Sequence, residues 1–152
     1  MAVESIKNQK PIVVDANQQM VGRMASKIAK LLLEENHVVV LNVEKSLMSG
    51  SRKNIITEYN QRHELKSVVN PINSPHKPRQ PDKILHRMIR GMLPRRKIRG
   101  QNALKRLKVH IGIPEQYRSV EKMIFEDAKP NKPAQFYVTM GEIATSQGWG
   151  SR

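Results

Sequence analysis

The stretch IVVDANQQMVGRMASKIAKLLLEENHVVVLNV, residues 12–43, decides the fold, because it reads as strand, helix and strand. Its first part, IVVD at 12–15, suits a short buried strand. Its middle part, 21–36, repeats apolar residues at the spacing of one helix face. These residues are Val21, Ala25, Ile28 and Leu32. Its last part, HVVVLNV at 37–43, is a continuous apolar run, which is typical of a strand covered on both faces. The stretch therefore predicts a βαβ unit, with a parallel pair of strands and a right-handed crossover.

Two further helices are predicted in the middle of the chain. Residues 52–66, RKNIITEYNQRHELK, form the weaker candidate. Its inward positions would be Ile55, Ile56 and Tyr59. Residues 82–92, DKILHRMIRGM, form the stronger one, with Asp82 as the expected N-cap and Pro94 beyond the end. Its apolar stripe consists of Ile84, Leu85, Met88, Ile89 and Met92.

The remaining segments are shorter or less regular. QNALKRL at 101–107 predicts a short helix and LKVHIGI at 107–113 a strand. Residues 67–81 contain four prolines and predict an extended arm that becomes ordered on contact. Residues 114–138 are polar and without periodicity, and 139–150 predict a terminal helix. Two residues of that helix stand at capping-box spacing, Thr139 and Glu142. The chain thus predicts one small α/β domain over 1–152, with extended segments near 67–81 and 114–138.

The composition points to a polyanionic partner. The 152 residues hold 27 Lys plus Arg against 13 Asp plus Glu, a net charge of +14, and no cysteine. Such a charge attracts nucleic acid or an anionic membrane surface. The lack of cysteine excludes disulfides and thiolate zinc sites and fits a cytoplasmic protein. The longest apolar run, VVVL at 38–41, is far too short to span a membrane.

Most of the charge lies between His76 and His110, where twelve Lys or Arg accompany a single acid, Asp82. Arginine predominates in RGMLPRRKIRG at 90–100, and its planar fork suits bidentate contacts with phosphate. We expect Gly91 and Gly100 to let the backbone approach a phosphate closely or adopt positive φ.

Two other interpretations of this basic block fit the sequence less well. A solvated, solubilising face would not need charge of a single sign. A membrane-binding helix would need an exposed apolar stripe, whereas Met92, Leu93 and Leu107 are expected to anchor the block to the core. Aromatic residues are only 4% of the chain, which disfavours single-strand stacking platforms. Recognition of the shape and backbone of structured RNA fits better.

Sites of other kinds find weaker support. MSGSRKN at 48–54 lacks the ending of a Walker A loop, although Arg52 and Lys53 are expected to touch RNA phosphate. The five histidines form no close metal-ligand pair, so no metal and no cofactor are expected. Asp15 and Glu44 stand at strand ends, where α/β enzymes place catalytic groups. An RNA-modifying enzyme or a nucleotide-binding α/β protein is therefore the alternative function, but no nucleophile, base and orienter can be proposed from spacing.

Three segments resemble, in order and spacing, the universal large-subunit ribosomal protein thirteen family. They are VVDANQQMVGRMASKIAKLLL, VVVLNVEKSLMSG and RMIRGMLPRRKIRGQNALKRLKVHIGIP, within about 12–114. RGMLP at 90–94 resembles the family signature, and GEIATSQGW near the C-terminus resembles the archaeal and eukaryotic branch. His110 departs from the pattern, since the family usually has an aromatic such as tyrosine there.

The resemblance implies a three-layer α/β/α fold with a small, mainly parallel sheet of about four strands. It also implies a structural, non-enzymatic role in the large ribosomal subunit, in the cytoplasm. The expected partners are large-subunit rRNA and neighbouring large-subunit ribosomal proteins, with no membrane and no small-molecule substrate. The residues expected to bind RNA are Arg52, Lys53, Lys77, Arg79, Arg87, Arg90, Arg95, Arg96, Lys97, Arg99, Lys105, Arg106 and Lys108.

Overall fold

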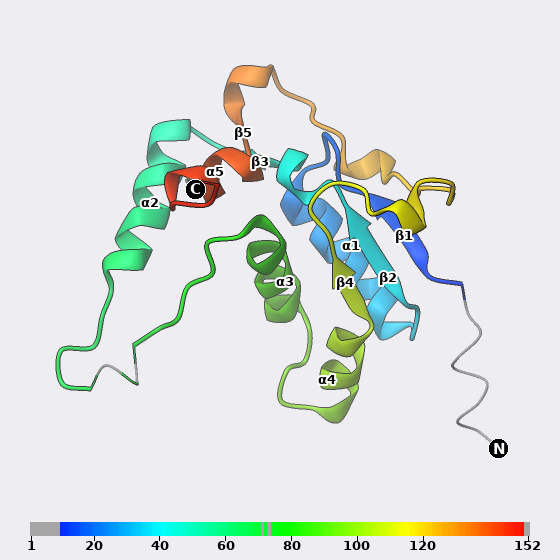
Figure 1. Cartoon of the computed structure of the whole chain (residues 1–152), viewed down its shortest axis with the longest axis horizontal. Helices are drawn as coiled ribbons and strands as arrows, with labels where there is room; N and C mark the ends of the chain where they lie inside the picture. Colours follow the sequence, from blue (N-terminus) through cyan, green and yellow to red (C-terminus); the bar gives the residue numbers. More distant parts are fainter. Residues whose placement is uncertain (1–9, 71, 73, 151–152) are drawn as a thin grey trace.

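A parallel sheet of three strands forms the centre of the computed structural model, which describes residues 10–70, 72 and 74–150. The order is β1 (Ile12–Asp15), β2 (Val38–Leu41) and β4 (Leu107–Val109), and both pairs are parallel (Figure 1). All four residues of β2 are buried, as expected for the middle strand of a covered sheet. The predicted parallel pair at 12–43 is confirmed.

Helices cover one face of this sheet. α1 (Val21–Leu33) packs against α3 (Pro81–Met92) and α4 (Ile98–Lys105). The whole predicted stripe of α1 is buried, and it joins one apolar cluster with Leu85 and Ile89 of α3. Because Ile84, Leu85 and Ile89 point inward, the basic residues between them on α3 face away from the core.

The other face of the sheet has a thinner cover. Val13, Val39 and Leu41 pack against Ile113 and Tyr117, which belong to the segment around the 3₁₀ helix η4 (Glu115–Tyr117). The ring of His110 lies 5.9 Å from that of Tyr117, centroid to centroid. The layer on this side is therefore built from extended chain and a short 3₁₀ turn.

The α/β class is confirmed, and the strands divide into two groups. Beside the three-stranded sheet, β3 (Leu47–Ser49) and β5 (Tyr137–Thr139) form an antiparallel pair. α2 (Arg52–Glu64) and α5 (Met140–Ser146) flank this pair, joined through Ile55, Val138 and Ile143. The predicted cap of α5 is confirmed, since the hydroxyl of Thr139 accepts the N–H of Glu142 at 3.2 Å.

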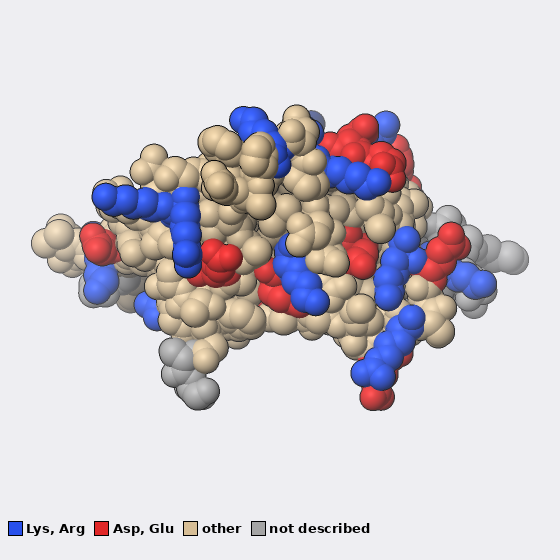
Figure 2. All heavy atoms as spheres, turned by 90° about the horizontal axis from the view of Figure 1, so that it is seen from above, with Lys and Arg blue, Asp and Glu red and all other residues tan. Residues whose placement is uncertain are grey.

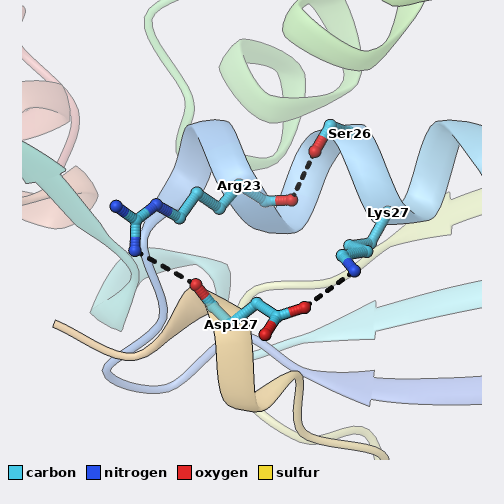
Figure 3. A network of polar contacts seen from close by, with 4 residues as sticks. All are labelled: Arg23, Ser26, Lys27 and Asp127. Atoms are coloured by element: carbon cyan, nitrogen blue, oxygen red, sulfur yellow. Dashed lines mark hydrogen bonds and ion pairs between the residues drawn. The ribbon is translucent and has the colours of Figure 1, made fainter.

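Residues 114–138 contain two more 3₁₀ helices, η5 (Glu126–Ala128) and η6 (Ala134–Phe136). Asp127 attaches η5 to α1 (Figure 3). Its carbonyl accepts from Arg23 at 3.2 Å, and its carboxylate pairs with Lys27 at 2.8 Å. The hydrogen bond from Lys27 and its charge hold the pKa of Asp127 below the ordinary value.

Two predicted positions are wrong. Gln80, not Asp82, is the N-cap of α3, because Pro81 occupies the first helical position with its fixed φ. Met92 does not anchor the basic block, since it is 45% exposed. Met92 is the last residue of α3. Leu93, just after the helix, is buried and packs into the core in place of Met92.

The contact between Gly100 and Pro94 folds the basic block back on itself. A Cβ on Gly100 would lie 2.2 Å from the carbonyl oxygen of Pro94, inside any allowed contact. Gly100 does not have positive φ, so the packing and not the backbone conformation requires glycine here.

Gly100→Ala should lower the free energy of unfolding by about 1–3 kcal/mol, because backbone must move to admit the methyl group. Urea unfolding measures this change. The control is Gly22→Ala in α1, where a Cβ would meet nothing within 4 Å. This control should stabilise the protein by about 0.5–1 kcal/mol through helix propensity. Equal effects of the two changes would contradict the steric argument.

Candidate nucleic-acid interface

Four adjoining hollows form one groove between α2, the arm at 74–80, α3 and the loop at 93–97. The hollows lie next to one another, because neighbouring hollows share lining residues, among them Lys77, Arg87 and Arg90. We call this surface the basic groove. Its Lys and Arg residues are Arg62, Lys66, Lys77, Arg79, Lys83, Arg87, Arg90, Arg95, Arg96 and Lys97. No Asp or Glu lines any of the four hollows.

Basic side chains also fix the arm that forms one wall of the groove. The ammonium of Lys77 donates to the carbonyl oxygen of Arg62 at 2.8 Å, which joins the arm to the end of α2. The guanidinium of Arg87 donates to the carbonyl oxygen of His76, which joins the arm to α3. The proline-rich segment is thus held against the two helices by residues that themselves line the groove.

The loop at 93–97 closes the other end. Its turn is fixed by the N–H of Arg95 donating to Leu93 at 2.7 Å and that of Lys97 donating to Pro94 at 3.0 Å. Arg95, Arg96 and Lys97 are all exposed. Three cations in sequence, held on a turn, present their charge outward.

The charge of the groove is almost uncompensated. In the described part of the chain, Arg62 with Glu58 is the one ion pair that includes a groove cation. The face of the molecule seen from above in Figure 1 is different, because acidic and basic side chains are interspersed there (Figure 2). A groove lined by one sign of charge concentrates the positive potential at one place.

Seven of the thirteen residues predicted to bind RNA line the groove. They are Lys77, Arg79, Arg87, Arg90, Arg95, Arg96 and Lys97. The structure brings these together although the arm and the loop are separated by α3. RNA contact by each of them stays a prediction.

The other six predicted residues lie elsewhere. The exposed Arg99 and the half-buried Arg106 donate to the carbonyl oxygens of Leu33 and Leu32, at 3.1 and 3.0 Å. These contacts provide donors for carbonyl oxygens at the C-terminal end of α1, where a positive charge also interacts favourably with the helix dipole. Arg52 pairs with Glu142 at 3.3 Å. The exposed residues outside the four hollows are Lys53, Lys105 and Lys108.

Sequence reasoning did not select the contribution of α2 to the groove. Arg62, His63 and Lys66 line it, as do Lys83 and His86 of α3. The available signal was the basic spacing of Arg62 and Lys66, four residues apart at the end of a predicted helix. Only the fold shows that this helix end faces the arm.

Two histidines of the groove favour the neutral form. Burial lowers the pKa of His86, and the charge of Arg90 lowers it further, against a smaller opposite effect of Asp82. Burial and the charges of Arg79 and Lys77 lower the pKa of His63. In the neutral form these two imidazoles add no positive charge to that of the Lys and Arg residues of the groove.

The strand-end acids of the alternative enzyme site are engaged inside the protein. The carboxylate of Asp15 accepts from the side chain of Asn42 at 2.9 Å and from the N–H of Asn17 at 3.0 Å. The carboxylate of Glu44 accepts the N–H of Gly112 at 3.1 Å. These contacts hold the loops that follow β1, β2 and β4, which explains both acids structurally.

The described ranges, 10–70, 72 and 74–150, contain neither a metal-ligand cluster nor a membrane-spanning helix. No group of three or more His, Cys, Asp or Glu there could hold a metal ion. No helix within them has the length and apolar character needed to cross a membrane.

Comparison with known proteins places the chain among ribosomal proteins. The sequence pattern of the family described as Ribosomal protein L13 matches residues 9–116. "Large ribosomal subunit protein uL13" of Methanococcus maripaludis is 41% identical over 138 residues, covering 90% of this chain and 97% of that protein. The proteins of the same name from Sulfurisphaera tokodaii and Methanococcoides burtonii are 40% and 38% identical. Each alignment covers 90% of this chain, and 94% and 96% of the relative, respectively.

Acidification should destabilise the protein partly through His63 and His86. Their folded pKa values lie below the unfolded value of 6.5, so the unfolded state binds more protons as the pH falls through about 6.5. Between about pH 7.5 and 5.5, the variant His63→Gln/His86→Gln should therefore lose less free energy of unfolding than the wild type. Urea unfolding at both pH values measures this, and His37→Gln controls for removing an imidazole outside the groove. An equal loss of free energy of unfolding in the double variant and the wild type would show that His63 and His86 do not cause the pH dependence.

Proposed function

The chain belongs to the ribosomal protein L13 family and is a structural constituent of the large ribosomal subunit, and from this premise we propose that it binds large-subunit rRNA through the basic groove. The observation that carries the proposal is a row of adjoining hollows lined by ten Lys or Arg and no acid. Folded RNA presents phosphates along its ridges, and such a groove can neutralise several of them at once. The protein is structural and not an enzyme, as its family is.

The positions of the cations suit a sugar–phosphate backbone better than single phosphates. Arg79, Arg87 and Arg95 come from the arm, from α3 and from the following loop, so the charge is spread over a path. Arginine forks can contact adjacent phosphate oxygens bidentately, and the loop cations remain exposed. Contacts of this kind fix the position of the RNA without reading its sequence.

We further propose that residues 1–152 act as one rRNA-binding domain, with neighbouring large-subunit proteins as additional partners. The support is that both walls of the groove pack on common elements. α2 contacts α5, and α3 contacts both α5 and α1. A groove shared in this way needs the whole scaffold to keep its width.

Affinity for a large-subunit rRNA fragment should fall steeply with salt. The expected log–log slope is about −5 to −8, for about six to nine neutralised phosphates. Filter binding or fluorescence anisotropy over a salt series measures the slope. A flat response would refute phosphate contact by the groove.

Charge reversal in the loop should separate binding from folding. The triple variant Arg95→Glu, Arg96→Glu, Lys97→Glu should bind rRNA at least tenfold more weakly, because about three phosphate contacts become repulsive. Its circular dichroism and melting temperature should stay near wild type, since all three side chains are exposed. The matched control reverses the same charge at the exposed residues Lys45, Arg118 and Lys132, outside the groove. If both variants lose affinity equally, net charge and not the groove determines binding.

Gly91 should affect stability and binding in opposite directions. It is an exposed residue of α3 that lines the groove, and a Cβ there would meet nothing within 4 Å. Gly91→Ala should raise the free energy of unfolding by about 0.5–1 kcal/mol through helix propensity. It should weaken rRNA binding, because the methyl group stands where a phosphate would approach the helix. Gly22→Ala, which makes the same change outside the groove, should leave affinity unchanged. If Gly91→Ala binds rRNA as tightly as the wild type, no phosphate approaches the helix closely at Gly91.

A further inference from the structure

One of the four hollows has an apolar floor, unlike a surface made only for phosphates. It has a volume of about 370 Å³ and lies between α2, the arm and α3. Tyr59, Pro78, Ile84 and Met88 form its apolar part. The polar groups around it are Arg62, His63, Lys77 and Arg87, without an acid. It opens into the rest of the basic groove through shared residues, including Pro78 and Arg87.

We infer that this hollow holds one unstacked nucleobase of the bound rRNA, with the flanking phosphates on Lys77 and Arg87. The inference rests on the proposed function and names a subsite within it. A nucleotide combines a planar, largely apolar ring with an anion a short distance away. The hollow offers the complementary pair, an aromatic and aliphatic interior beside cations. Bases unstacked from loops and bulges are commonly stacked on aromatic rings or guanidinium planes in this way.

The size of the hollow limits its occupant. About 370 Å³ lies near the lower end of the roughly 300–1,000 Å³ found for small-ligand pockets. This volume fits one planar ring system. A free phosphate would leave the apolar part without a partner, and a duplex could not enter.

The stacking surface is held in place before any ligand binds. The guanidinium carbon of Arg62 lies 5.4 Å from the centroid of the Tyr59 ring. The carboxylate of Glu58, one helical turn earlier, pairs with the guanidinium of Arg62. Lys77 donates a hydrogen bond to the backbone carbonyl oxygen of Arg62. Because the ion pair holds the guanidinium near the ring and Lys77 holds the backbone of Arg62, a base entering here would need little rearrangement of the protein.

Tyr59 also supplies a polar group. Its side chain is half-buried, and no described residue makes a hydrogen bond with its hydroxyl. A phenol keeps its proton at neutral pH because its ordinary pKa is about 10, and burial raises the pKa of Tyr59 further. The hydroxyl can therefore donate a hydrogen bond to a base edge or a ribose oxygen. One aromatic residue does not make a single-strand platform, but it suffices for one extruded base.

The test compares Tyr59→Leu and Tyr59→Phe in the full chain, with a large-subunit rRNA fragment as the ligand. Tyr59→Leu should weaken binding by roughly 5- to 100-fold, the loss typical for one base–aromatic stack. The salt slope should not change, because no cation is removed. Tyr59→Phe keeps the ring and should stay within a few-fold of wild type. Tyr117→Leu, a half-buried tyrosine on the other face of the sheet, is the matched control and should bind as wild type does.

A second variant keeps the test valid if Tyr59→Leu unfolds, since Tyr59 also packs against the core. Met88→Phe enlarges a half-buried side chain that lines the hollow and removes no charge. It should weaken binding at an unchanged salt slope. In addition, 2-aminopurine placed at successive positions of the fragment should show, at one position, a fluorescence change on binding that Met88→Phe abolishes.

The outcomes separate this subsite from the basic groove. If folded Tyr59→Leu and Met88→Phe bind as tightly as wild type, the base-binding hollow is refuted and the groove stands. A loss of affinity that comes with a shallower salt slope also refutes it, because the residues would then act through the cations. A wild-type protein that fails to bind the rRNA fragment overturns the proposed function and this inference together.

Discussion

The packing of α3 on α1 is the contact on which the rest of the molecule depends. Leu85 and Ile89 are fully buried against the same cluster as Ile28 and Leu32. This burial, of the order of 1.5–3 kcal/mol for each large apolar side chain, fixes the rotation of α3 about its axis. That rotation directs the basic face of the helix outward and places its two ends beside the arm and the loop. The groove is thus a consequence of the apolar stripe, and it could not exist on a helix that was free to turn.

The same arrangement gives the free protein an unfavourable electrostatic energy, because many positive charges lie close together. Like charges gathered in one groove repel one another, and the described chain provides a single internal counter-ion, Glu58, for the ten cations. Any polyanion that binds only the folded state relieves this repulsion and stabilises the fold by mass action. The hydrophobic contacts must therefore exceed the repulsion in the free protein, and a polyanion bound in the groove would remove that requirement.

The features of the fold that the sequence predicts are those set by residues close together along the chain. The βαβ unit and the stripe of α3 are predicted because periodic burial along one segment determines them. The pair β3–β5 is not, because two strands of three residues each, about ninety positions apart, leave no periodic signal. Seven basic residues of the groove are predicted from the sequence, but the groove itself is not, since the position of Arg62 beside the arm depends on the tertiary fold. Gly100 was noted for its backbone freedom, yet its contact with Pro94 is what requires it.

Arg99 and Arg106 have a consequence for the chain as it is made. In the folded protein their guanidinium groups bind the last carbonyl oxygens of α1. In an unfolded chain α1 has no such end, and the same two arginines are free to contact any RNA. Folding therefore ties these two cations to the backbone of the protein itself, and it gathers ten others in a groove of fixed shape.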